Sequence, residues 1–236
     1  MTLPKLNDVP KYELIIPSTG KSVSFRPFLV KEQKILLMAL ETQDEKQILN
    51  AIVDTIKVCV YDNIVIESLA TFDVEYMFLQ IRSKSAGETS KVFLRCSECN
   101  ESTQVSINLG DINIKIDKKS KEIVLTDKYT LIMKYPKYAG ILLNVDKQTD
   151  GTVTSAIFEM IMMCMDSLRS EDDIINLSDE PRQELENFLD GLNPTQLELI
   201  MTFVNTLPKL QHDVKYKCSS CEHDNKITLQ GIQDFF

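Results

Sequence analysis

The sequence has no long hydrophobic run, little histidine and little glycine. No apolar stretch approaches the roughly 18–20 residues of a membrane-spanning helix, and the densest, Ala156–Met165, is interrupted by Glu159. The two histidines, His212 and His223, lie near no nucleophile motif, so a histidine-based catalytic triad has few candidates. The seven glycines form no phosphate-binding loop. We therefore predict that the protein has no membrane span and is not an enzyme.

Basic residues are also too few to give the chain a positive charge. The 26 Lys and Arg residues are outnumbered by 35 Asp and Glu residues, and the net charge is −9. Domains that bind nucleic acid usually carry a basic stripe, so we predict no general nucleic-acid binding. A composition of 43% hydrophobic and 26% charged residues is typical of a globular chain. At 236 residues it could form one large domain or two small ones.

Two stretches far apart in the sequence resemble each other. Lys91–Arg95 and Val214–Lys217 are alternating apolar and polar runs, which predict strands. A Cys-x-x-Cys pair follows each run and a second alternating run follows each pair, so we expect two β-hairpins with the cysteines at their turns. The second runs are Val105–Leu109 and Ile227–Leu229, and we expect the second copy to be two residues shorter between its cysteines and this strand, which makes the internal repeat degenerate.

The two hairpins together predict one structural Zn²⁺ site with tetrahedral geometry. Its ligands would be Cys96, Cys99, Cys218 and Cys221, because a two-residue gap lets both sulfurs of a pair bind one ion. Four protein thiolates leave no position for water, so the site is expected to be structural rather than catalytic. The alternatives are two redox motifs or four thiols that bind no metal, but redox pairs usually begin a helix. His223 could replace one cysteine, although we expect it at the surface.

The other two cysteines, Cys59 and Cys164, stand inside apolar helical patterns and are predicted to be buried thiols. Six cysteines without a signal sequence fit a reducing compartment better than a secreted disulfide framework.

The order of periodic segments predicts an α+β chain in which two helical blocks are tied together by two zinc-knuckle hairpins and a small antiparallel sheet. Five segments are expected along the chain. They are an N-terminal arm and β-hairpin (1–28), a helical block (29–86), the first knuckle and a β-meander (87–135), the second helical block (136–208), and the second knuckle, which completes the zinc site (209–236).

Several local expectations can be tested against the structure. Arg26 is predicted to be structural, either stacked between aromatic rings or paired with a helix carboxylate, and the alternative is an exposed contact with a partner. Ser178 is predicted to cap one helix, and Asn193 is predicted to cap the last helix in a capping box with Gln196. The terminal Phe235 and Phe236 are expected either to fold back onto the knuckle sheet or to be buried in a partner, because exposed phenylalanines are costly.

Short motifs at three places resemble a known family. They are Leu3–Leu6, Phe25–Phe28 at the end of the first hairpin, and Leu94–Cys96 before the first cysteine pair. In these motifs, in their order and in the length of the chain, the protein resembles the baseplate hub assembly proteins of T4-like contractile-tailed bacteriophages. The resemblance covers most of the chain and implies no catalytic residues.

The resemblance implies a non-enzymatic role in building the central hub of the tail baseplate, through contacts with other phage tail and hub proteins. It places the protein in the cytoplasm of the host bacterium during assembly, and leaves open whether it stays in the virion baseplate. The competing interpretation is a zinc-ribbon protein that binds nucleic acid or regulates transcription. A metallohydrolase is the weakest interpretation, because its metal would need an open coordination position.

Overall fold

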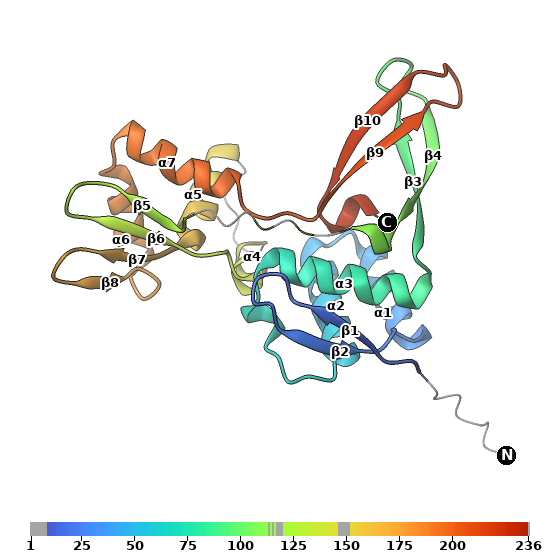
Figure 1. The fold of residues 1–236 in the computed structure, drawn as a ribbon, viewed down its shortest axis with the longest axis horizontal. Helices are drawn as coiled ribbons and strands as arrows, with labels where there is room; N and C mark the ends of the chain where they lie inside the picture. Colours follow the sequence, from blue (N-terminus) through green and yellow to red (C-terminus); the bar gives the residue numbers. More distant parts are fainter. Residues whose placement is uncertain (1–8, 113, 115, 117–119, 146–151, 236) are drawn as a thin grey trace. The chain divides into compact units, whose positions relative to one another are not determined.

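The computed structural model describes residues 9–112, 114, 116, 120–145 and 152–235 (Figure 1). The fold mixes helices with small antiparallel sheets, and the chain divides into two compact units. Unit 1 comprises Met1–Ile116 and Lys209–Phe236, and unit 2 comprises Asp117–Pro208. The residues expected to form an N-terminal arm before Val9, and the expected position of Phe236, lie outside the described residues.

The described part of unit 1 contains three β-hairpins and three α-helices. Their bounds are β1 Tyr12–Ile15, β2 Ser22–Phe25, α1 Val30–Thr42, α2 Glu45–Cys59, α3 Thr71–Ala86, β3 Thr89–Arg95, β4 Ser102–Asn108, β9 Gln211–Lys217 and β10 Asp224–Gln230. Short 3₁₀ helices lie at Ile66–Ser68, Leu109–Asp111 and Ile232–Phe235. The turn of the first hairpin is held to α3, because the backbone N–H and hydroxyl of Ser18 donate to the buried Asp73 carboxylate at 2.9 and 2.5 Å.

The β3–β4 and β9–β10 hairpins are closer copies of each other than the sequence alignment suggested. All four strands have 7 residues. Strand β4 begins at the third residue after Cys99, and β10 begins at the third residue after Cys221. The expectation that the second copy is two residues shorter before its second strand was therefore wrong. The copies differ after the strands, where the 3₁₀ helices have 3 and 4 residues.

The two hairpins share one hydrophobic core. Alternate residues of their strands point inward, as the period of two predicts, and they pack with residues of α3 and of the two 3₁₀ helices. The buried residues of this core are Leu79, Val92, Leu94, Ile107, Leu109, Ile112, Leu210, Val214, Tyr216, Leu229 and Phe235.

Phe235 folds back onto the hairpins, as one of the two interpretations of the sequence expected. Its side chain is fully buried, and its backbone carbonyl accepts a hydrogen bond of 2.8 Å from the Ser90 hydroxyl. The C-terminal end of the described chain is thereby attached to β3.

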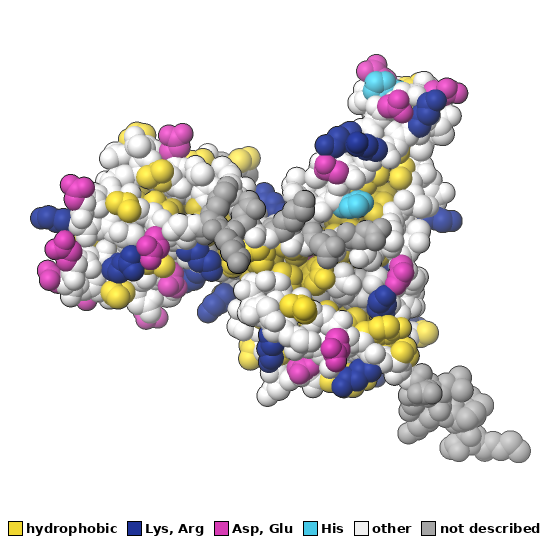
Figure 2. Space-filling view, viewed as in Figure 1, with side chains coloured by type: hydrophobic (Ala, Val, Ile, Leu, Met, Phe, Trp, Pro, Cys, Tyr) yellow, Lys and Arg dark blue, Asp and Glu magenta, His cyan; other side chains and the backbone are white. Residues whose placement is uncertain are grey.

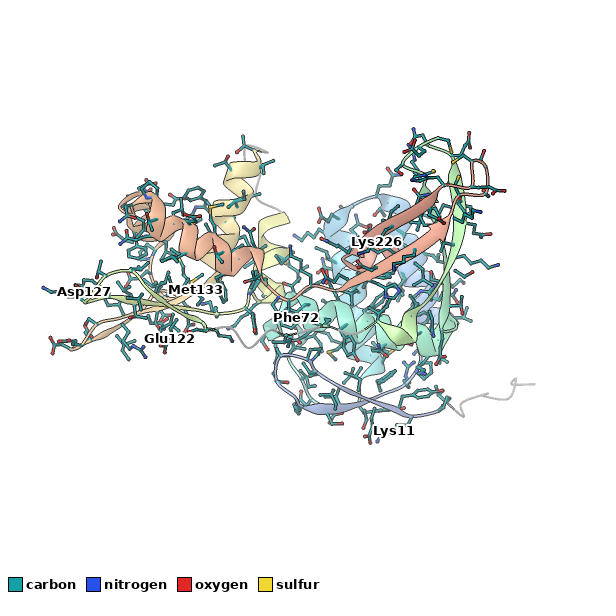
Figure 3. The ribbon with its side chains drawn as sticks, turned by 45° about the horizontal axis from the view of Figure 1, so that its top comes forward. Lys11, Phe72, Glu122, Asp127, Met133 and Lys226 are labelled. Carbon is teal, nitrogen blue, oxygen red and sulfur yellow. The ribbon has the colours of Figure 1, made fainter. Side chains whose placement is uncertain are left out.

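Unit 2 combines a four-stranded antiparallel sheet, in the order β5-β6-β7-β8, with helices. Its described elements are β5 Glu122–Val124, β6 Thr130–Met133, α4 Tyr138–Val145, α5 Val153–Cys164, β7 Met165–Arg169, β8 Ile174–Asn176, α6 Arg182–Asp190 and α7 Pro194–Asn205. Residues of the sheet and of α5, α6 and α7 form its core, including the fully buried Leu131, Ile161 and Ile200. Met133, labelled in Figure 3, belongs to the same core.

The strands β7 and β8 were not predicted. Residues 136–208 were expected to form a helical block, but α5 ends at Cys164, and Met165 pairs with Met133 as the first residue of β7. The apolar pattern of Ala156–Met165 is compatible with both a helix and a strand. Pairing with β6 places Met165 in a strand, because tertiary context overrides local propensity.

Two predicted helix starts had different outcomes. Ser178 does not cap a helix, because α6 begins at Arg182 and Pro181 is its N-cap; a residue that precedes proline is disfavoured in the helical region. The capping box of α7 is confirmed, since Asn193 Oδ1 accepts from the Gln196 N–H at 3.0 Å and Gln196 Oε1 accepts from the Asn193 N–H at 2.9 Å.

Candidate metal centre

The turns of the β3–β4 and β9–β10 hairpins meet at their cysteine pairs (Figure 1). The sulfur atoms of Cys96, Cys99, Cys218 and Cys221 all lie within 4.8 Å of one another. Two of the sulfur contacts join the two hairpins: Cys96 Sγ lies 3.6 Å from Cys221 Sγ, and Cys99 Sγ lies 3.6 Å from Cys218 Sγ. Among the described residues, His223 is not part of this group.

These distances fit four sulfurs around one ion. Zinc–sulfur bonds of about 2.3 Å in tetrahedral geometry place neighbouring sulfurs about 3.8 Å apart. A disulfide would require about 2.05 Å, and all six cysteines are free thiols. Four soft sulfur ligands in this arrangement suit Zn²⁺ or iron, so the four cysteines could hold a metal ion.

Each cysteine pair is shaped by a short backbone turn. In the first hairpin the Cys96 N–H donates to the Glu101 carbonyl at 3.0 Å, and the Asn100 N–H donates to the Cys96 carbonyl at 3.0 Å. Asn100 adopts a left-handed backbone conformation with φ 62°, which lets the chain reverse right after the second cysteine. The second turn repeats these features at Cys218, Glu222 (φ 60°) and His223, with hydrogen bonds of 2.9 and 3.1 Å.

The backbone of each turn also directs N–H groups at the sulfurs. The N–H groups of Cys221 and Ser220 lower the pKa of Cys218 to about 6. The N–H of His223 acts in the same direction on Cys221, but the sulfurs of Cys99, Cys96 and Cys218 and burial outweigh it and raise the pKa of Cys221 to about 12. Four thiolates this close repel one another, so a cation among them would favour the form that binds metal.

Side chains from each hairpin also support the first cysteine of the other hairpin. The buried Asn225 on β10 donates from Nδ2 to Cys96 Sγ at 3.4 Å, while its Oδ1 accepts from the Ser97 N–H at 3.0 Å. The buried Thr103 on β4 donates from Oγ1 to Cys218 Sγ at 3.8 Å and accepts from the Ser219 N–H at 3.2 Å.

Thr103 and Asn225 are equivalent in the repeat, since each is the second residue of its strand. The cluster is therefore supported by two reciprocal sets of contacts across the hairpin pair. Sequence reasoning missed both residues. The available signal was that each is a polar residue at the fourth position after the second cysteine of its pair, where the strand pattern points inward.

Replacing Asn225 with alanine is expected to weaken metal binding about 10- to 100-fold, the usual effect of removing a group that orients a metal ligand. Competition with a chelator would measure this change. Lys226→Ala is the matched control, because Lys226 (labelled in Figure 3) is the next residue of β10 and its side chain forms an exposed ion pair with Asp213. Equal affinities for Asn225→Ala and the control would contradict a supporting role.

The remaining two cysteines are buried thiols, as predicted. Cys59 and Cys164 are fully buried, and burial raises their pKa to about 11 and about 12, respectively. Both thiols are therefore protonated at neutral pH and inaccessible, which separates them chemically from the four clustered cysteines.

A closed cluster of four sulfurs that joins two hairpins is typical of proteins with a structural metal centre. The family is identified independently. The chain belongs to the T4 bacteriophage base plate protein family, whose model matches residues 9–236. No curated protein and no solved structure matches the chain. In the part of the chain that the structure describes, every helix is too short or too polar to cross a membrane.

The resemblance to T4-like phage proteins is thus confirmed at the level of a phage baseplate protein. Family membership agrees with a structural role, with other phage tail proteins as partners.

Proposed function

We propose that the protein acts at the hub of the phage tail baseplate, as a non-enzymatic hub component or hub assembly factor that binds other tail proteins. Family membership over residues 9–236 is the observation that carries this proposal. The protein would act in the cytoplasm of the infected bacterium during assembly.

We further propose that the four cysteines bind one Zn²⁺ with a structural role. Two-stranded hairpins are at best marginally stable alone, and both CxxC hairpins are two-stranded sheets. Closing the long loop between them costs about 5 kcal/mol in chain entropy. Structural zinc binds peptides with an apparent free energy of ~10–16 kcal/mol, folding included. The binding free energy would therefore exceed the entropic cost, and the ion would stabilise the hairpin pair.

The alternative of a zinc ribbon that binds nucleic acid receives less support from the surface of the hairpins. Two basic side chains there are paired with acidic ones, Lys217 with Glu222 at 3.1 Å and Lys226 with Asp213 at 3.0 Å. On the face drawn in Figure 2, both signs of charge occur together at the end of the hairpins. A basic stripe, which nucleic-acid binding requires, is not formed by these pairs.

Deleting the gene from the phage is expected to yield particles without complete baseplates, while phage DNA replication continues. Electron microscopy of the lysate and quantification of phage DNA would measure the two effects, and a plasmid copy of the gene is the control that should restore baseplates. A pull-down from infected cells should recover at least one tail or hub protein. Intact tails combined with loss of late transcription would instead support the regulatory zinc-ribbon interpretation.

A further inference from the structure

Over residues 35–40, helix α1 is apolar on every side and yet largely exposed. Residues 35–40 are six consecutive apolar residues, and the buried residues of the helix are only Glu32 and Ala39. A helix that is apolar all round normally lies inside a core, and a large exposed apolar patch marks a binding surface. The exposed apolar residues of α1 are Val30 (70%), Ile35 (54%), Leu37 (51%), Met38 (66%) and Leu40 (50%).

A groove extends this surface within unit 1. A cavity of about 720 Å³ is lined by residues of α1 together with Ile48 and Ile52 of α2 and Phe78 of α3. Leu37 and Leu40 belong both to this lining and to the exposed set. Apolar side chains of a binding partner could therefore contact both the exposed apolar face of α1 and the cavity beside it.

The exposed charges on α1 are arranged against the dipole of the helix. Lys31 and Lys34 lie in its N-terminal half, and Glu41 lies in its last turn, followed by the N-cap residue Asp44 of α2. A helix favours acidic side chains at its start and basic ones at its end. Lys31 lies 3.3 Å from Glu32 of the same helix, whereas Lys34 and Glu41 are complementary to a copy of α1 that runs in the opposite direction.

We propose that α1 binds α1 of a second copy of this chain in an antiparallel, two-fold arrangement. A two-fold axis between Leu37 and Met38 places Lys34 opposite Glu41 of the second copy, and Glu41 opposite its Lys34. Positions 34 and 41 are seven residues apart and thus share one helix face. Each contact is then made twice, as two-fold symmetry requires.

The apolar centre of this interface is formed by Leu37 and Met38 of both copies, between the two charged pairs. A helix of 13 residues is about 20 Å long at 1.5 Å per residue. Two such helices, packed together with their grooves, would bury about 1,200 Å² of surface, which is at the low end for stable protein–protein interfaces. We therefore expect association in the micromolar range, dependent on protein concentration. This proposal depends on neither the zinc nor the hub role.

Sedimentation equilibrium of the full-length protein from low to high micromolar concentration tests the proposal. Lys34→Glu and Glu41→Lys should each weaken self-association at least about 10-fold, because each variant places like charges in both contacts, and like charges across an interface are strongly unfavourable. An equimolar mixture of the two variants should associate, because unlike charges then face each other in both contacts. The double variant Lys34→Glu/Glu41→Lys should recover the association of the wild type.

Lys128→Glu is the matched control, because Lys128 is exposed and lies in unit 2, and circular dichroism would verify that each variant is folded. A wild type that stays monomeric throughout the concentration range would overturn the proposal. So would single variants that associate as well as the control, or a mixture that associates no better than its components. Capture of another tail protein by the α1 surface of a monomeric chain would assign the surface to that partner instead.

Discussion

Replacing Cys218 with serine is expected to remove stoichiometric metal from the protein and to loosen both CxxC hairpins together. Serine is a poor ligand for zinc, and the loss of Cys218 leaves three sulfurs in a site that needs four. Because metal binding and folding of such sites are coupled, the β3–β4 hairpin should lose order although the substitution is in β9–β10. Elemental analysis and amide hydrogen exchange of both hairpins would measure these effects.

Cys59→Ala is the matched control, because it removes a buried thiol of the same unit that is not part of the cluster. Protein purified under reducing conditions without chelator should contain one zinc per chain, in the wild type and in this control. A wild type without stoichiometric metal would contradict the zinc proposal, whereas stoichiometric iron would correct only the identity of the ion. Faster exchange in β9–β10 alone would mean that the two cysteine pairs do not share an ion.

Arg26→Ala is expected to lower the free energy of unfolding by about 3–5 kcal/mol, the usual cost of removing one partner of a buried ion pair. Arg26 Nη2 lies 2.9 Å from Glu32 Oε1, and the two side chains are 13% and 4% exposed. Glu32 Oε2 also accepts the Leu29 N–H at 2.8 Å, at the start of α1. The pairing of Arg26 with a helix carboxylate, one form of the predicted structural role, is thus present.

The effect of Arg26→Ala should depend on pH. Burial raises the pKa of Glu32, but the hydrogen bonds from Arg26 and from the Leu29 N–H outweigh it, so that the pKa lies below its ordinary value of 4.5. A depressed pKa contributes stability above the unfolded value and loses it as the pH falls through the folded value. The difference in melting temperature between wild type and variant should therefore be largest near neutral pH and shrink below about pH 4.5.

The double variant Arg26→Ala/Glu32→Gln is the control for this pair. In Arg26→Ala the buried Glu32 carboxylate keeps only its contact with the exposed Lys31, at 3.3 Å, as an ion pair. The double variant removes this carboxylate and should recover part of the lost stability, because the cost of a broken pair lies mainly in the buried charge that loses its partner. Thermal unfolding at several pH values would measure all three proteins. An unchanged melting temperature for Arg26→Ala combined with failed baseplate assembly would favour the alternative, in which Arg26 is a contact with a partner.

Local sequence patterns were sufficient to predict some elements of the fold. The alternation of β3 and β9 and the spacing of the four cysteines predicted two hairpins with cysteines at their turns, because a strand's period and a turn's geometry depend on neighbouring residues. The capping box of Asn193 and Gln196 was predicted for the same reason, since both hydrogen bonds join residues three positions apart.

Other features of the fold and of the cysteine cluster depend on contacts between residues that are distant in the sequence. Met165 could belong to a helix or a strand, and its pairing with Met133 placed it in β7. Asn225 and Thr103 support cysteines of the opposite hairpin, so no local pattern could identify them as parts of the cluster. The amino-acid sequence by itself thus determined which cysteines could meet and which short segments form hairpins. Only the tertiary structure decided which side chains surround them, because such contacts depend on where distant segments pack.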